Sequence, residues 1–371
     1  MSGNKDLLWL TLDDALITLG AQFREVALGI LITQLNPHTS SYAWYFLAGS
    51  VPGFLMAQVY GWASRRWPPR LIMSISYIIR IVLVIALWRT ANFWIALIFI
   101  DGIATGGGFY AAAQSHYIAV PNSFQGTQSQ VVRLRQSTGL MQLAGPLLAG
   151  AILAHVGSRH GFLVCAFAYA FALLMVSRLS KKSVDGTPQL RSWNWRPDRL
   201  VLIMALLSFL TWIANSLALA YLFHILHRQE FGYGLVLSLW GGSGLIASYL
   251  FSRMRKHTGR WIGPLFAMQG LCWLALWHGV SFAIFAGLGA IEGLVNWLVQ
   301  DILVTEVLAW CPEGEAGIAR SRIGAYTKIG AIAGTATVLL MPSAFLIRPA
   351  YGLIGLFSLG AGLLFLLFKS V

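Results

Sequence analysis

The stretch Arg133–Leu153, RLRQSTGLMQLAGPLLAGAIL, begins with two arginines and continues as an apolar segment that is long enough to cross a bilayer as a helix. Gly139, Gly145 and Gly150 give this helix small residues on which a second helix can pack closely. Pro146 removes a backbone donor and bends the helix. The stretch therefore predicts a membrane helix entered from a basic surface. We expect Gly145 and Pro146 to serve conformational change rather than substrate contact.

The same pattern occurs again near the end of the chain, where Arg320 and Arg322 precede another apolar run. An offset of 187 residues carries Arg133 and Arg135 onto this second pair. The same offset aligns basic residues at two other places, which are Arg66 with Arg253 and Lys182 with Lys369. A constant offset with six apolar segments in each part predicts two parallel, pseudo-symmetric six-helix bundles.

Composition places the protein in lipid. Of the 371 residues, 57% are hydrophobic and 11% are charged, and the mean hydropathy is +0.68. A soluble domain carries about a quarter of its residues as charges, so this chain is predicted to be an all-α integral membrane protein, because lipid offers backbone groups no partners. Twelve apolar segments are predicted as transmembrane helices: 8–33, 42–63, 70–89, 92–114, 136–155, 161–178, 200–226, 232–252, 261–278, 281–308, 318–341 and 350–368.

The basic residues predict the orientation. With the N-terminus in the cytoplasm, 19 of the 26 Lys and Arg residues fall on the cytoplasmic side and four on the other. This asymmetry predicts a multi-pass protein of the cytoplasmic membrane with both termini in the cytoplasm. It also accounts for the net charge of +13 without nucleic acid as a partner. The polar stretch 179–199 is predicted to be a cytoplasmic linker between the bundles 1–178 and 200–371, and the chain is expected to act as a monomer.

The sequence lacks the motifs that several other classes of function require. No GxxxxGK[ST] loop occurs, so transport driven by ATP is not expected. The three cysteines are far apart, and His224 with His227 has no evident third ligand, so neither a metal nor a cofactor is expected. No catalytic framework stands on a soluble domain, so we do not expect an enzyme. Asp13 and Asp14 lie in the first apolar segment, which continues into a full span rather than a cleavable signal peptide.

The first predicted span carries a polar stripe. Asp14, Thr18, Gln22 and Glu25 follow one another at steps of four, four and three, which places them on one helix face. Such a stripe should face a water-filled cavity. Glu25 and Asp14 are candidate proton carriers, and Thr18 and Gln22 are candidate substrate contacts. Alternatively, Glu25 and its neighbour Arg24 form a structural ion network. Asp13 is expected near the cytoplasmic helix end, where a carboxylate is favourable.

A second stripe lies in the tenth span, where Glu292, Asn296 and Gln300 recur at every fourth position and Asp301 follows. A charge in the bilayer centre costs about 2.5–3.5 kcal/mol on insertion scales, so each one needs a partner or a purpose. Glu292 is predicted to face the substrate or a proton. Asn296, Gln300 and Asp301 are candidates for the cavity wall.

Spans three and four contain Arg80 and Asp101, both about nine residues from the loop between them. Adjacent antiparallel helices could join them as a structural ion pair, or Asp101 could be protonated with Arg80 as its relay. Further candidates for the substrate cavity are Asn215 in span seven and Tyr326 and Lys328 in span eleven. Lys328 either extends to the cytoplasm or neutralises an anionic substrate.

Three stretches of this chain resemble the major facilitator superfamily, and most of all its branch of macrolide efflux pumps and the enterobactin exporter. They are LLWLTLDDALITLGAQFREVALGILITQL at 7–35, GWASRRWPPR at 61–70 and AGPLLAG at 144–150. The superfamily has G-x-x-x-D-R-x-G-R-R in the second stretch. Gly61 and Arg66 match it, whereas Arg65 stands where the acid is expected and Pro68 where the next glycine is expected.

The resemblance implies a central cavity lined by spans one, four, seven and ten, with a gate at the cytoplasmic side. The gate would hold Gly61, Arg65 and Arg66 with the two arginine pairs, Arg133 and Arg135 and Arg320 and Arg322. Because the acid of the loop is missing, Glu313 and Glu315 are predicted partners of Arg133 and Arg135.

The resulting functional prediction is a secondary active transporter that exports an amphipathic small molecule, drug-like or siderophore-like, in exchange for protons by alternating access. Two alternatives remain open. The first is an uptake permease of the same fold for a siderophore or nutrient. The second is a transporter-like sensor that binds without transporting.

Overall fold

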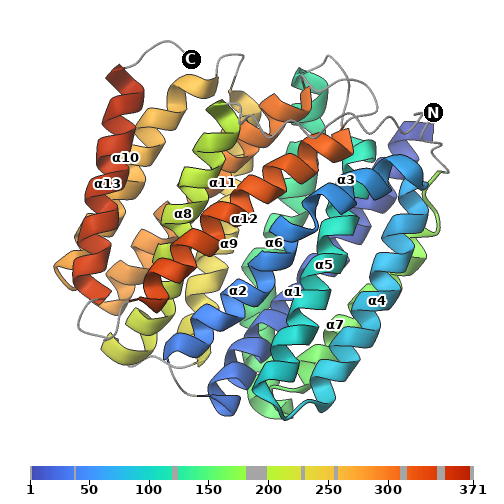
Figure 1. Cartoon of the computed structure of the whole chain (residues 1–371), viewed down its shortest axis with the longest axis horizontal. Helices are drawn as coiled ribbons and strands as arrows, with labels where there is room; N and C mark the ends of the chain where they lie inside the picture. Colours follow the sequence, from blue (N-terminus) through green and yellow to red (C-terminus); the bar gives the residue numbers. More distant parts are fainter. Residues whose placement is uncertain are drawn as a thin grey trace.

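The computed structural model describes residues 2–36, 39–118, 124–180, 199–226, 230–254, 258–309, 316–340 and 347–367, which are helical with short connections, as predicted (Figure 1). The thirteen α-helices of these residues are α1 (Ser2–Leu35), α2 (Thr39–Leu55), α3 (Ala57–Arg66), α4 (Pro69–Arg89), α5 (Phe93–Ile118), α6 (Phe124–Val156), α7 (His160–Val176), α8 (Arg199–Ala220), α9 (Glu230–Arg253), α10 (Ile262–Trp277), α11 (Phe282–Ala309), α12 (Ala316–Leu339) and α13 (Ile347–Leu367). A single π-helical turn, Tyr221–Ile225, extends α8. Seven segments are long and apolar enough to cross a bilayer, so the chain is an all-helical, multi-pass membrane protein.

The count of thirteen differs from the twelve predicted segments because the second segment is divided. Pro52 lies inside α2, and Met56 separates α2 from α3. The backbone ladder nevertheless continues, since Met56 N donates to Pro52 O at 2.9 Å and Tyr60 N donates to Met56 O at 2.9 Å. A proline removes one ladder donor and bends a helix. The two helices therefore form one bent run over the predicted span 42–63.

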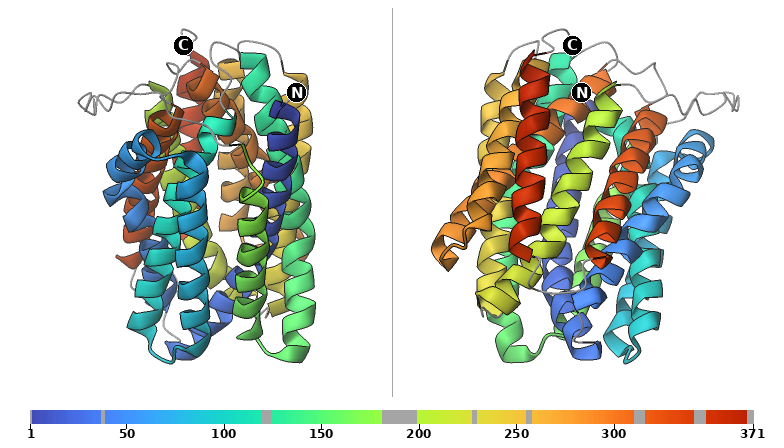
Figure 2. Two further views of the ribbon diagram at one scale, coloured as in Figure 1. Left: turned by 90° about the vertical axis from the view of Figure 1, so that its right-hand side faces the viewer. Right: turned by 60° about the vertical axis from the view of Figure 1, so that its left-hand side comes forward.

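The first turn of α1 and the last turn of α13 lie at the same end of the bundle, which we call the terminal end (Figure 2). The helix α1 is longer than predicted, because it begins at Ser2 rather than near residue 8. Asp13 therefore lies three turns inside the helix, and its side chain is fully buried. Its predicted position near a helix end is wrong.

Buried hydrophobic side chains form two clusters. The first is drawn from α1 and α3 to α7 with Leu179, and the second from α8 to α13 with Val132 of α6. The predicted linker 179–199 lies almost entirely outside the described residues.

The small residues of Arg133–Leu153 lie against two other helices. A Cβ on Gly139 would lie 2.8 Å from Leu245 Cδ2 of α9, and one on Gly145 would lie 2.7 Å from Gln22 Cγ of α1. Gly150 has open space beside it. The predicted small-residue face therefore packs α6 against α9 and α1, which is the close packing that glycine permits in membranes.

The helices α10 and α13 approach each other most closely through glycines, and they run side by side in Figure 1. A Cβ on Gly355 would lie 2.8 Å from Leu274 N and 2.9 Å from Gly270 O. A Cβ on Gly362 would lie 2.6 Å from Ala267 N. The two backbones are therefore in contact, and no flexible side chain can move aside to admit a larger residue.

We predict that Gly355→Leu destabilises the protein, because its Cβ meets backbone atoms of α10. Overpacking typically costs about 1–3 kcal/mol, so the thermal unfolding temperature in detergent should fall by several degrees. Gly360→Leu in the same helix is the matched control, since a Cβ there meets nothing within 4 Å. Equal unfolding temperatures for the two variants would contradict the close approach of α10 and α13.

Candidate functional site

Three neighbouring cavities lie between the helices. The aromatic cavity has a volume of about 330 Å³, the basic cavity about 390 Å³ and the terminal cavity about 550 Å³. Glu25, Phe46 and Trp212 line both the aromatic and the basic cavity. Gly49 and Lys328 are among the residues that line both the basic and the terminal cavity. The three cavities are therefore neighbours that share parts of their walls.

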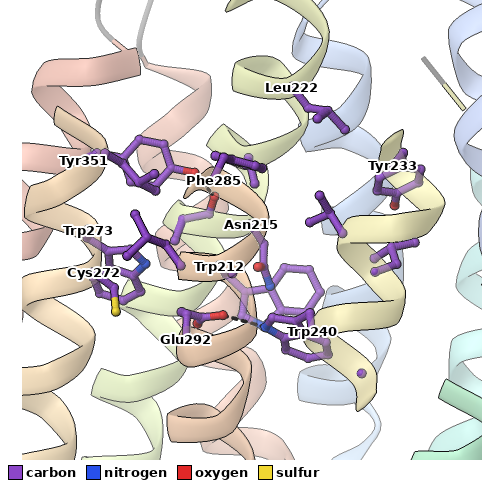
Figure 3. Close-up of a pocket in the computed structure, with 18 of the residues that line it drawn as sticks. Trp212, Asn215, Leu222, Tyr233, Trp240, Cys272, Trp273, Phe285, Glu292 and Tyr351 are labelled. Atoms are coloured by element: carbon purple, nitrogen blue, oxygen red, sulfur yellow. Dashed lines mark hydrogen bonds between the residues drawn. The ribbon is translucent and has the colours of Figure 1, made fainter. Parts of the chain in front are cut away.

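The aromatic cavity has Glu292 in its wall. Figure 3 shows this carboxylate beside Trp240, with rings of Trp212, Trp273 and Phe285 around the same space. Asn215 and Tyr351 also line this cavity. The cavity is thus apolar over most of its wall and carries two carboxylates, Glu292 and Glu25.

Neutral groups hold the Glu292 carboxylate. Trp240 Nε1 donates to Oε2 at 2.5 Å, and Gln269 Nε2 donates to Oε1 at 3.2 Å. The side chain is 6% exposed. Among the described residues, the ion pairs within 4 Å are Arg24–Glu25 and Arg135–Asp301. Glu292 therefore has no cationic partner at that distance.

Glu25 lies where the aromatic and basic cavities meet. Arg24 Nη2 donates to Glu25 Oε1 at 2.6 Å, and the Tyr45 hydroxyl donates to Oε2. Arg24 Nη1 also donates to Tyr169 Oη at 2.8 Å. The alternative of an Arg24–Glu25 ion network is thus present, and the same carboxylate lines both cavities.

Arg80 and Asp101 do not form the predicted ion pair. Arg80 Nη2 donates to Tyr169 Oη at 2.6 Å, and its guanidinium lies 4.2 Å from the centre of that ring. Helical side chains extend toward the N-terminus of their own helix, so Arg80 reaches Gly106, whose added Cβ would lie 2.8 Å from Arg80 Cγ. The predicted pair rested on the equal distance of the two residues from the loop, and this distance does not take the direction of the side chains into account. Asp101 is half-buried and lines none of these three cavities.

The terminal cavity is lined by five charged residues, Asp14, Arg135, Asp301, Arg320 and Lys328. Arg135 of α6 donates to Asp301 Oδ1 of α11 through Nε at 3.1 Å and Nη2 at 2.9 Å. The Arg135 guanidinium also lies 4.0 Å from the centre of the Trp297 ring. Arg320, Thr18 and Gln300 line this cavity too. Arg135 thus has a partner in α11 that the sequence did not suggest, while the predicted partners Glu313 and Glu315 lie outside the described residues.

Asp13 and Asp14 point to different neighbours. Asp13 accepts from Tyr77 at 2.7 Å and from Tyr110 at 2.6 Å. Asp14 accepts from Gln114 Nε2 at 3.1 Å and lines the terminal cavity. Adjacent residues of a helix point about 100° apart, which explains why one carboxylate is enclosed by α4 and α5 and the other reaches a cavity.

The remaining candidates divide into cavity residues and buried or peripheral ones. Gln22 lines the aromatic cavity. Asn296 and Tyr326 are buried and line none of the three cavities, and Asn296 Oδ1 accepts from Gln300 Nε2 at 2.7 Å. Lys328 Nζ donates to Gly49 O at 3.3 Å.

Near the terminal end, Arg66 lies 5.5 Å from the centre of the Trp62 ring, and Gly61 is buried with its carbonyl accepting from Ser64. Arg133 is exposed, while Arg65 and Arg322 are half-buried. Gly145 and Pro146 are both buried between helices.

The part of the chain from α1 to α7 contacts the part from α8 to α13 near the terminal end. Gln128 Nε2 of α6 donates to Phe251 O of α9 at 2.8 Å. A Cβ on Gly317 of α12 would lie 3.0 Å from Ser64 Cβ of α3 and 2.9 Å from His116 Nε2 of α5. These contacts and the Arg135–Asp301 pair hold α3, α5 and α6 against α9, α11 and α12.

No protein-family model matches the sequence, and no curated protein matches it. Solved structures share its fold over almost the whole chain. The human organic anion transporter MFSD10 (TETRAN) superposes with a TM-score of 0.78 at 13% identity and covers 100% of both chains. A bacterial homologue of the iron transporter ferroportin, in an outward-facing state with soaked iron, superposes with a TM-score of 0.72 at 16% identity over 98% of this chain and 99% of that one. The chain therefore has the fold of major facilitator-type transporters, whereas the resemblance to the macrolide and enterobactin branch stays a prediction.

We predict that Asp301→Asn destabilises the protein, because it leaves Arg135 without its counterion. Breaking a buried pair by removing one partner costs about 3 kcal/mol. Thermal unfolding should show this loss, and the double variant Arg135→Gln/Asp301→Asn should recover part of it. A double-mutant cycle measures the coupling. Additive effects of the two substitutions would contradict a stabilising pair.

Proposed function

We propose that this protein is a secondary active transporter that exports an amphipathic organic molecule in exchange for protons. The observation that carries the proposal is Glu292, a buried carboxylate in the wall of the aromatic cavity that is held only by neutral donors among the described residues. Removing an ionised carboxylate from water is costly unless it is paired, and intramembrane acids commonly mark ion or substrate pathways. A proton and a substrate can therefore take turns at this group.

The sequence of events follows from the contacts of Glu292. A proton entering from the outside neutralises the carboxylate, and the hydrogen bond from Trp240 weakens because bonds to charged acceptors are the stronger ones. The molecule leaves the aromatic cavity outward during this half of the cycle. Loss of the proton to the cytoplasm restores the charged carboxylate for the next molecule. Glu25 and Asp14 are the further proton-coupling candidates, since each lines a cavity.

A chain of direct contacts connects Glu292 to the terminal end. The carbonyl of Trp240 accepts from Trp297 Nε1 at 3.2 Å, and the two rings lie 4.9 Å apart. Arg135 lies on Trp297 and pairs with Asp301. A change at Glu292 can therefore alter the packing beneath the ion pair that holds α6 against α11.

The proposed architecture counts α2 and α3 as one span, so that twelve spans form two pseudo-symmetric bundles, 1–178 and 200–371, joined by a cytoplasmic linker at 179–199. The separate hydrophobic clusters support this division. We place the protein in the cytoplasmic membrane with its terminal end on the cytoplasmic side, because most Lys and Arg residues fall on that side in the predicted topology. The contacts there then represent a state closed to the cytoplasm. Gly145 and Pro146 would act as the bend and seal when the bundles rock.

The comparisons support transport in general, since the solved structures of this fold are named as transporters rather than enzymes. Direction and coupling are part of the proposal. An uptake permease would move the molecule inward along with its coupling ion. A sensor would bind the molecule and show no flux under any gradient.

We predict that Glu292→Gln abolishes substrate-driven proton movement, because the amide cannot carry a proton on and off. Proteoliposomes with an internal pH dye would be exposed to 2-naphthalenesulfonate, 2-naphthalenesulfonamide and 2-naphthyltrimethylammonium as anionic, neutral and cationic probes. Glu25→Gln should impair coupling as well. Glu306→Gln is the matched control, because Glu306 lies in the same helix α11 and lines none of the three cavities. Normal coupling in Glu292→Gln would refute the assignment of this carboxylate.

A second prediction concerns alternating access. The Cβ atoms of a disulfide lie about 3.8 Å apart, and a Cβ on Gly317 would lie 3.0 Å from that of Ser64. The oxidised double variant Ser64→Cys/Gly317→Cys should lock the terminal end closed and stop flux. Reduction should restore flux, and the single variant Ser64→Cys should be insensitive to the oxidant. Undiminished flux in the fully cross-linked protein would contradict the proposed gate.

A further inference from the structure

The basic cavity contains charges that proton exchange at Glu292 does not use. Arg24, Arg80 and Lys328 line it together with a single carboxylate, Glu25. We infer that this cavity binds the anionic group of the transported molecule, a carboxylate, sulfonate or phosphate, while its apolar part occupies the aromatic cavity. This inference rests on the proposed transport function and names its class of substrate.

Three cations and one carboxylate line the basic cavity, so two of the cations lack a carboxylate of the cavity wall to pair with. Arg24 is paired with Glu25 at 2.6 Å, so these two charges offset each other. Arg80 and Lys328 make no ion pair within 4 Å among the described residues. Titratable side chains near these cations include Tyr45, which donates to Glu25, and Tyr169, which accepts from both arginines. The Arg80 guanidinium also lies 5.9 Å from the centre of the Tyr77 ring, and Asp13 and Cys165 are close enough to interact with it electrostatically. An anion would therefore complete the charges of the cavity.

Arg80 has an unused donor. Its side chain is 7% exposed and lines the cavity. The Nη2 atom donates to Tyr169, whereas the buried Nε atom makes no hydrogen bond to any residue that the structure describes. A buried donor without a partner costs about 1–3 kcal/mol, and a guanidinium binds carboxylate, sulfonate or phosphate oxygens with more than one N–H at once.

Lys328 contributes the second cation from the other part of the chain. It extends from α12 toward α2, where Nζ donates to Gly49 O at 3.3 Å and lies 5.6 Å from the centre of the Trp212 ring. Arg80 stands on α4. An anion between them would touch helices of both bundles, which is what a molecule transported by rocking bundles requires.

Two glycines leave room beside these cations. Gly49 of α2 and Gly107 of α5 both line the cavity, and a Cβ on either would meet nothing within 4 Å. The volume of about 390 Å³ exceeds that of a single acidic group. Because Phe46 and Trp212 line both cavities, a ring stacked there can extend from one to the other.

A purely structural role explains less. Arg80 does tie α4 to α7 through Tyr169. That tie accounts for Nη2 but leaves Nε unsatisfied, and it gives no reason for Lys328 to project from α12 into the same space. Two cations that make no ion pair within 4 Å among the described residues, beside an open glycine wall, are better explained by a ligand with negative charge.

The test is equilibrium binding to the full chain in nanodiscs, measured by calorimetry with the same naphthalene probes. We expect the sulfonate to bind about ten-fold more tightly than the neutral sulfonamide, because a charge-assisted bond is about twice as strong as a neutral one. Arg80→Gln and Lys328→Gln should each remove this preference and leave sulfonamide binding unchanged. Gly107→Leu should weaken both probes by filling the cavity, and Gly360→Leu should weaken neither.

Equal affinity for the sulfonate and the sulfonamide would overturn the inference, as would tighter binding of the trimethylammonium probe. A parallel loss of both probes in Arg80→Gln would show a structural role for that residue, and Lys328→Gln would then decide whether an anion site exists. Failure here is separable from failure of the transport proposal. Flux without anion preference would remove this site alone, and anion binding without flux would remove the transporter.

Discussion

The ion pair between Arg135 and Asp301 is the contact on which the arrangement of the helices at the terminal end depends. It joins α6 to α11, and the side chains are 20% and 1% exposed. A buried pair persists only while both partners remain, because a single charge left in a low dielectric is strongly destabilising. Separation of α6 from α11 therefore requires another cation for Asp301. Arg320 lines the same cavity, so in the proposed opening of the terminal end it would be the cation that Asp301 pairs with next.

The intramembrane carboxylates fall into two classes by what holds them. Asp301 and Glu25 are paired with arginines, Asp301 with Arg135 of another helix and Glu25 with its own neighbour Arg24. Glu292 is held by an indole and an amide, and Asp13 by two tyrosines. Neutral donors leave a carboxyl group free to gain and lose a proton, because no paired cation holds it in the charged form. The Arg135–Asp301 pair is thus suited to holding α6 against α11, and the second class to exchanging protons.

The sequence predicted the helices and the polar stripes well, because hydrophobic length and a spacing of three or four residues are local properties. Asp14, Thr18, Gln22 and Glu25 all line cavities. The sequence could not predict which side chains pair between different helices. Asp301 lies 166 residues from Arg135, and no local pattern selects it. Arg80 reaches a tyrosine instead of Asp101, since a long side chain extends along its helix. Asn296 follows the spacing of Glu292 but bonds Gln300 within its own helix.

The loop after the second span lacks the acid that the resemblance implies, and a buried ion pair is present between α6 and α11. In the resemblance to major facilitators, an acid of the loop after the second span would serve the gate, and here Arg65 occupies that position. The pair Arg135–Asp301 lies between helices instead, and Asp301 is almost fully enclosed. An interior pair is screened by salt and water far less than one in a loop. It also shares its cavity with Asp14, Arg320 and Lys328. In the proposed transport cycle, protonation of these groups or an anion bound beside them would therefore change the strength of the Arg135–Asp301 pair directly.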